Sequence, residues 1–226
     1  MKLQNTNLTA ALAILSLTAS LPAATTLLGT HVKNTDGDET FATVFGSSFT
    51  FTSGNVYLVY DMTFDNATNP GTLDTTSSYG GYSHSAGDLI GQNWQQSTVG
   101  AIYYGTRNDI AGATITSGTA IKIVVKYELN AVGLDGDTIK VWVDPTLGTG
   151  TESAADDADP TRIWNPTTIS SSDMRFRRGN SSDNEITFSN VTIYSDGDSP
   201  FAVVPEPSST SLLGLGALAL ILRRRK

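Results

Sequence analysis

Apolar and polar residues alternate along most of the chain between residues 49 and 194. Every even position from Val56 to Phe64 is apolar, and the same period of two recurs at 121–129, 139–143 and 174–176. A period of two places successive side chains on opposite faces of a strand, whereas an amphipathic helix repeats every 3.6 residues. The pattern therefore predicts half-buried strands and no long helix in this part of the chain.

Turn-forming clusters separate these segments, as in 69–71, 135–137 and 144–145, where Asn, Asp, Gly and Pro meet. The apolar phase changes between Ile186/Phe188 and Val191/Ile193, which predicts a bulge near Asn190. Further strands are expected at Phe49/Phe51 and from Val99 to Tyr104. Eight or more such strands predict an all-β fold, a two-sheet antiparallel β-sandwich of the jelly-roll kind.

The first 24 residues have the pattern of a secretory signal. A weakly basic start at Lys2 is followed by an apolar run from Leu8 to Leu21 and by the small residues Ala23 and Ala24. This tripartite order predicts a cleaved signal peptide, and the run is too short for an ordinary membrane span.

The C-terminal end combines an apolar run with a basic cluster. Leu212 to Leu222 are 11 apolar or glycine residues, followed by Arg223, Arg224, Arg225 and Lys226. Four cations after an apolar run are typical of a stop-transfer signal, and we expect a short transmembrane helix whose basic end stays in the cytoplasm. The region before it carries Pro205-Glu206-Pro207.

These three parts, in this order from Val203 to Lys226, resemble the PEP-CTERM sorting signal of Gram-negative bacteria. The resemblance implies that an exosortase, a membrane transpeptidase-like protease of biofilm-forming cells, recognises the tail and cuts it. A plain C-terminal anchor that is never processed is the alternative. A lipid-anchor signal fits less well, because its apolar tail would not end in four cations.

The expected organisation is therefore a signal peptide at 1–24, a β-sandwich at 25–198, a linker at 199–211 and a transmembrane helix with its basic tail at 212–226. Removing both ends leaves nine basic and 21 acidic residues in 25–204, a net charge of −12. Such a body is a poor partner for nucleic acid and suits neutral glycans or divalent cations. The absence of cysteine excludes disulfides and thiolate chemistry.

The order of the strand segments is similar to that of LamG and concanavalin A-like jelly rolls. The similar pieces are 49–64, 121–128, 137–145 and 186–194. That group contains lectins, adhesion modules and glucanases, so the resemblance alone implies no single function.

No enzymatic motif is evident in the body. Retaining glucanases of this fold carry Glu-x-Asp-x-x-Glu on one strand, and none of the four glutamates of the body, Glu39, Glu128, Glu152 and Glu185, starts that pattern. The two histidines, His31 and His84, are expected to be exposed polar residues, and no serine has a Gly-x-Ser-x-Gly context. We expect a protein that is not an enzyme. The alternative is a carbohydrate-active hydrolase with a nonstandard carboxylate pair.

Two kinds of binding site remain candidates. Carboxylates at Asp156, Asp157 and Asp159 are the hard oxygen ligands that calcium prefers, although Asp-rich loops also serve as turns. Four aromatic residues, Trp142, Trp94, Tyr103 and Trp164, are candidates for stacking on sugars. Trp142 lies in the polar phase of its strand, so it either faces solvent or packs under a loop.

One basic cluster, Arg175, Arg177 and Arg178, either meets an acidic polysaccharide or balances nearby acids on a solvated strand face. Taken together, these patterns predict an exported cell-envelope or extracellular-matrix protein. Its expected partners are the secretion machinery, the inner membrane before processing, an exosortase-type enzyme and an extracellular polysaccharide.

Overall fold

The structure is a computed structural model that describes residues 25–73, 79–84, 89–92, 101–104, 108–129, 138–155, 157–158, 168–179, 184–195 and 197–203. The predicted signal peptide, the Pro-Glu-Pro motif and the predicted transmembrane helix lie outside these ranges. No helix within the described ranges is long and apolar enough to cross a membrane.

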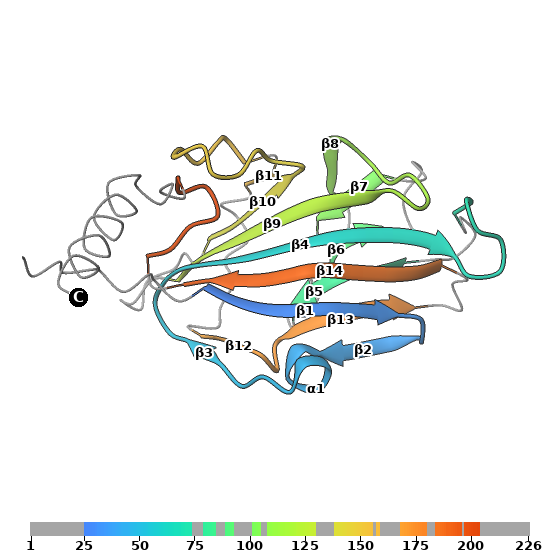
Figure 1. Cartoon of the computed structure of the whole chain (residues 1–226), viewed down its shortest axis with the longest axis horizontal. Coiled ribbons are helices and arrows are strands. Elements are labelled where there is room, and N and C mark those ends of the chain that lie inside the picture. Colours follow the sequence, from blue (N-terminus) through green and yellow to red (C-terminus); the bar gives the residue numbers. More distant parts are fainter. Residues whose placement is uncertain are drawn as a thin grey trace, which may run out of the picture.

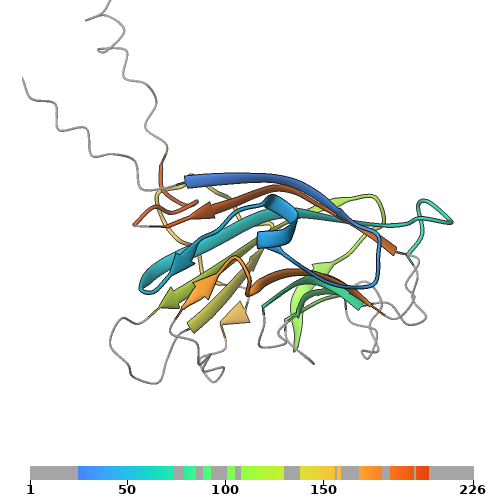
Figure 2. The same ribbon diagram turned by 90° about the horizontal axis from the view of Figure 1, so that it is seen from below.

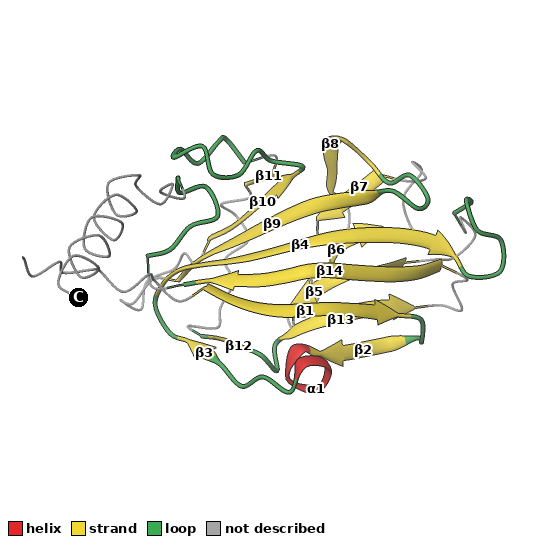
Figure 3. Cartoon of the chain, viewed as in Figure 1, coloured by secondary structure: helices red, strands yellow, loops and turns green. Residues whose placement is uncertain are grey.

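Two antiparallel sheets form the body, as the alternation predicted (Figure 1, Figure 3). The first sheet has six strands in the order β1 (Thr25–Lys33), β14 (Asn184–Tyr194), β4 (Gly54–Asn66), β9 (Ala120–Leu129), β10 (Thr138–Val143) and β11 (Asp157–Ala158). The second has the order β2 (Gly37–Thr40), β13 (Met174–Gly179), β5 (Tyr79–His84), β6 (Leu89–Gln92), β7 (Ala101–Tyr104) and β8 (Asn108–Thr114). A ribbon of β3 (Thr50–Phe51) and β12 (Ile169–Ser170) lies beside them.

The main core lies between the two sheets, which Figure 2 shows in side view. The even positions of β4 from Val56 to Phe64 are all buried there, as are the odd positions of β9 from Ile121 to Leu129. On β13 the same rule buries Met174 and Phe176. Alternation therefore predicted the inward faces of the long strands correctly, because one face of each strand must exclude water.

The predicted bulge is confirmed on β14. The register against β4 shifts between Ser189 and Thr192, and Asn190 has a left-handed backbone with φ of 54°. Asparagine tolerates this conformation better than most residues, and the Asn190 amide donates to Asp61 Oδ2 at 2.7 Å. Because the bulge shifts the phase by one residue, Phe188 and Val191 both reach the core.

The one helix among the described residues is α1 (Phe41–Phe45). Thr40 caps its N-terminus by accepting a hydrogen bond from Thr43 N, and Gly46 ends it in the left-handed conformation. This single turn places Phe41 in the core against Phe176, with ring centroids 4.6 Å apart.

A second, smaller cluster covers the outer face of the first sheet. It consists of Tyr57, Val59, Val124, Trp142 and Phe201. The loop at residues 144–155 and the segment at residues 197–203 supply its cover, and Figure 1 shows both at the same end of the molecule as the start of β1.

Candidate functional site

Two arginines lie side by side on the outer face of the second sheet. Arg175 and Arg177 alternate on β13 with the buried Met174 and Phe176, so their side chains point away from the core. Opposite them stand Ser83 and Gly81 on β5, and Thr40 and Asp38 on β2. About a third of each arginine side chain is exposed.

Asp38 holds both guanidinium groups in position. Its Oδ2 accepts from Arg175 Nη1 at 3.2 Å, and its Oδ1 lies 3.2 Å from Arg177 Nε. The third arginine of the cluster, Arg178, is more buried: it donates to the Asn34 carbonyl and lies 3.9 Å from Asp36. The structure therefore brings the basic cluster and nearby acids together. This agrees with the interpretation of the sequence in which the arginines balance acids on the strand face. We call Arg175, Arg177 and Asp38 the arginine face.

Glycines on β5 and β6 make the strands beside the arginine face approach closely. Gly81 pairs with Gly91, and a Cβ at either residue would lie 2.1 Å from a backbone carbonyl oxygen of the other strand. No side chain rises from these two positions, and both glycines are buried, as is Ser83 opposite Arg175.

Trp142 packs under a loop and is not exposed. Only 1% of the residue is accessible, its indole N–H donates to the Ser153 carbonyl at 3.1 Å, and its ring lies 5.3 Å from that of Phe201. Of the two alternatives that the sequence left open, the structure shows the one in which Trp142 packs under a loop, so this residue is not exposed for stacking on sugars. The polar phase of β10 faces a second layer of chain instead of water.

The other predicted binding residues lie outside the described residues or are described in their backbone alone. Trp94, Trp164, Asp156 and Asp159 lie outside the described residues, while Tyr103 and Asp157 are described only as backbone positions on β7 and β11. Within the described part of the chain, no group of three His, Asp or Glu side chains is arranged to hold a metal ion.

Two glutamates that the sequence separates do meet on the outer face of the first sheet. Lys126 Nζ lies 2.8 Å from Glu128 Oε1 and 3.0 Å from Glu152 Oε2, and Glu152 also accepts from the Tyr57 hydroxyl at 2.8 Å. Glu128 further pairs with Lys140 at 2.8 Å. The lysines neutralise both carboxylates, and this network stabilises the loop at 144–155. It differs from a catalytic acid–base pair, in which one of the two carboxyl groups must stay protonated.

Both histidines depart from the expectation that they are simply exposed. His31 stacks on Phe176 at 5.1 Å and lies 2.8 Å from Glu39, while burial lowers its pKa. His84 is 3% exposed and lies between the sheets, where burial lowers its pKa from 6.5 to about 4. The polar neighbours Ser83 and Ser85 gave no signal of this burial.

A cluster of three tyrosines, one of them next to His84, lies in the core. The Tyr82 and Tyr127 hydroxyls are 2.5 Å apart and join β5 to β9, and the Tyr127 ring lies 6.3 Å from that of His84. Tyr60 is fully buried, and its hydroxyl has no hydrogen-bond partner among the described residues. This cluster links the two sheets and has no access to solvent, so it can hold the sandwich together but cannot meet a polymer.

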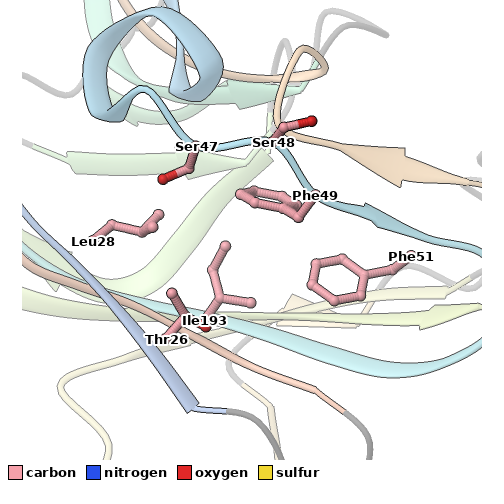
Figure 4. A pocket seen from close by; sticks show the side chains of 7 residues that line it. All are labelled: Thr26, Leu28, Ser47, Ser48, Phe49, Phe51 and Ile193. Carbon is pink, nitrogen blue, oxygen red and sulfur yellow. The ribbon is translucent and has the colours of Figure 1, made fainter.

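An apolar pocket of about 270 Å³ opens beside β1 (Figure 4). Leu28, Phe49, Phe51 and Ile193 supply its apolar walls, and Thr26, Ser47 and Ser48 line it as well. It holds no charged group, so it offers an apolar surface with a few hydroxyls at its rim.

Solved structures of carbohydrate-active enzymes have a similar fold. Alginate lyase Aly36B in complex with alginate tetrasaccharide is 16% identical, with 66% of this chain and 71% of that chain covered and a TM-score of 0.41. Endo-β-1,4-glucuronan lyase from the fungus Trichoderma reesei is 11% identical, with coverages of 74% and 79% and a TM-score of 0.42. The catalytic domain of a glycoside hydrolase family 131 protein from Coprinopsis cinerea is 12% identical, with coverages of 68% and 61% and a TM-score of 0.41.

These structures contradict the expectation that the body is not an enzyme, because two are lyases and the third is a catalytic domain. The missing glucanase pattern excluded only one arrangement of catalytic residues. At these identities the likeness is one of fold, the jelly-roll sandwich, and it assigns no reaction to this chain. Among curated proteins, no sequence matches the chain.

The C-terminal residues give the most specific match. Residues 203–226 match the family model of the PEP-CTERM protein-sorting motif, which includes Pro205-Glu206-Pro207 and the terminal cluster Arg223 to Lys226. The motif implies export, a membrane-anchored precursor and processing by an exosortase-type enzyme for the cell surface. The chain is thus an exported jelly-roll sandwich that carries a C-terminal PEP-CTERM sorting motif.

Proposed function

We propose that this protein is released to the cell surface or extracellular matrix, where its arginine face binds an acidic polysaccharide. The observation that carries the proposal is the pair of partly exposed guanidinium groups that Asp38 holds on one strand face. Guanidinium groups bind carboxylates through paired hydrogen bonds, and a fixed pair loses little entropy when it binds.

The spacing of the two arginines also supports an extended ligand. Arg175 and Arg177 are two residues apart on β13, so their side chains leave the sheet on the same face about 7 Å apart. A repeating uronate would present carboxylates along its length to the two arginines. The body as a whole is acidic, whereas the arginine face carries two cations against the single carboxylate of Asp38.

Binding is tested with purified polyuronates against a neutral glucan, in calcium and in a chelator. The double variant Arg175→Gln/Arg177→Gln is expected to weaken polyuronate binding at least about tenfold, since two charge-assisted contacts are lost. Wild-type affinity is expected to fall as salt rises. The same samples are assayed for new reducing ends, which report cleavage by hydrolysis or elimination, and for the ultraviolet absorbance of unsaturated uronates, which reports elimination alone.

Lys140→Gln is the matched control, because Lys140 is also a partly exposed cation on a strand but belongs to the first sheet. It should leave polyuronate binding unchanged. Equal losses in the control and the double variant, or no polyuronate binding by the wild type, would overturn the proposal.

Release is tested separately by the intact mass of the native protein from culture medium and from washed membranes. A medium form that lacks both ends and stops near Pro205-Glu206-Pro207 supports release by exosortase-type processing. A protein found only in membranes, with Arg223 to Lys226 retained, contradicts release and makes the tail a permanent anchor.

A further inference from the structure

The last described segment of the body is a strap, residues 197–203, that lies on the outer face of the first sheet. Its backbone is fastened to the loop at 144–155, since Gly148 N donates to the Pro200 carbonyl at 3.0 Å and Gly150 N donates to the Phe201 carbonyl at 2.7 Å. The Thr25 hydroxyl donates to Asp198, which ties the strap to the start of β1.

Phe201 anchors the strap. The residue is 2% exposed, and its ring lies 5.3 Å from Trp142 and 6.3 Å from Tyr57. Burying an aromatic side chain of this size contributes a few kcal/mol, so the docked strap is a fixed part of the sandwich.

This anchoring shortens the reach between the body and the apolar segment. The sorting motif begins at Val203, the residue where the strap ends, and the apolar run begins nine residues later at Leu212. Fully extended, nine residues span about 30 Å. If the strap were released back to Tyr194, 18 residues would span about 60 Å.

The end of the molecule that carries the strap has exposed aliphatic side chains beside three carboxylates, Asp144, Glu152 and Asp198, each of which accepts a hydrogen bond. Of the three large hydrophobic side chains exposed among the described residues, Leu27 at 70% and Val203 at 59% belong to this end. Residues 145–151 contain no charge, and Asp144 and Glu152 on either side accept hydrogen bonds from Lys122 N and Lys126 Nζ. The pocket with Phe49 and Phe51 also opens beside the start of β1 (Figure 4).

We infer that the strap end, made of residues 25–27, 144–155 and 197–203, lies on the lipid surface of the membrane in the anchored precursor. The short reach holds the body near the bilayer. Exposed aliphatic side chains are stabilised when they enter the interfacial region of the membrane. The opposite end, with the β4 terminus at Asn66, then points away from the membrane (Figure 1). This inference rests on the sorting motif and is independent of polysaccharide binding.

The absence of cysteine allows a direct test with single labels. Thr151→Cys marks the strap end and Ala67→Cys the opposite end, and both residues are exposed. The full chain with its tail is placed in vesicles of phosphatidylethanolamine and phosphatidylglycerol that contain a headgroup quencher. We expect severalfold stronger quenching of a fluorophore at position 151 than at position 67.

Two further substitutions separate docking from simple tethering. Phe201→Ala frees the strap and should reduce quenching at position 151 toward that at position 67. Leu27→Glu changes only an exposed side chain, so the fold is retained while the contact with lipid is weakened. This variant should also reduce the quenching at position 151. Equal quenching at both positions in the otherwise wild-type chain overturns the inference. Protection of position 151 only in native membranes, but not in lipid vesicles, also overturns it and assigns this end to a protein partner.

Discussion

At the scale of single residues, His84 is a buried group whose protonation affects stability. It points inward from β5, near the hydroxyl-bonded pair Tyr82 and Tyr127, and Asp173 and Arg175 act on it with opposite sign. Burial outweighs both and lowers its pKa from 6.5 to about 4. The neutral ring is therefore the form that the core accepts.

This predicts a loss of stability in mild acid. Between pH 6.5 and about 4 the unfolded chain binds a proton that the folded chain does not, so the free energy of unfolding falls as the pH is lowered through this window, by up to about 3 kcal/mol. Urea unfolding of the wild type and of His84→Gln at several pH values measures it. The variant should show a flatter pH dependence over this window, and parallel curves would contradict the assignment to His84.

At the scale of elements, the pairing of β5 with β6 depends on two glycines that face each other. A Cβ at Gly91 would lie 2.1 Å from the Gly80 carbonyl oxygen, and one at Gly81 would lie 2.1 Å from that of Ile90. No side chain can relieve such contacts, because the obstructing atoms belong to the backbone.

Gly91→Ala is therefore expected to force the two strands apart and to cost about 2–3 kcal/mol. Gly118→Ala is the control: its φ of 71° is also unfavourable for alanine, but no atom lies within 4 Å of the added Cβ. It should cost only about 1 kcal/mol. Thermal unfolding of the two variants measures the difference, and equal costs would show that the strand contact is not limiting.

At the scale of the whole molecule, a partly buried ion pair joins the two sheets at one edge. Lys33 on β1 is 1% exposed, and its Nζ lies 2.7 Å from Glu39 Oε1 on β2. Glu39 also meets His31 and Thr35, and the hydrogen bonds from Lys33 and Thr35 outweigh burial and lower its pKa. Each charge is accommodated because the other is present.

Breaking this pair from one side should be costly. Glu39→Gln leaves the Lys33 ammonium buried without a counter-charge and is expected to cost about 3 kcal/mol, whereas the double variant Lys33→Met/Glu39→Gln should recover part of that loss. Lys122→Met, which breaks the more exposed pair with Asp61, should cost less than about 1 kcal/mol. Denaturant unfolding of the wild type, Glu39→Gln, Lys33→Met and the double variant gives the coupling, and additive costs of the two single variants would contradict it.

The alternation in the sequence predicted the strands, their inward faces and the bulge at Asn190, because these depend on the backbone period within one segment. The tail predicted the sorting motif for the same reason, since its parts are contiguous. The sites were predicted less well: Trp142 follows the polar phase of β10, and residues 144–155 and 197–203 cover it.

What the sequence by itself determined was therefore local: the strand period, the turns, the change of phase and the order of the sorting signal. Only the tertiary structure decided which outward face becomes a second core, which histidine loses contact with water, and which acids meet the arginines of β13. A strand's two faces are set by its own residues. Whether the outer face meets solvent depends on segments far away in the chain, such as Phe201 over Trp142 and Asp38 beside Arg175.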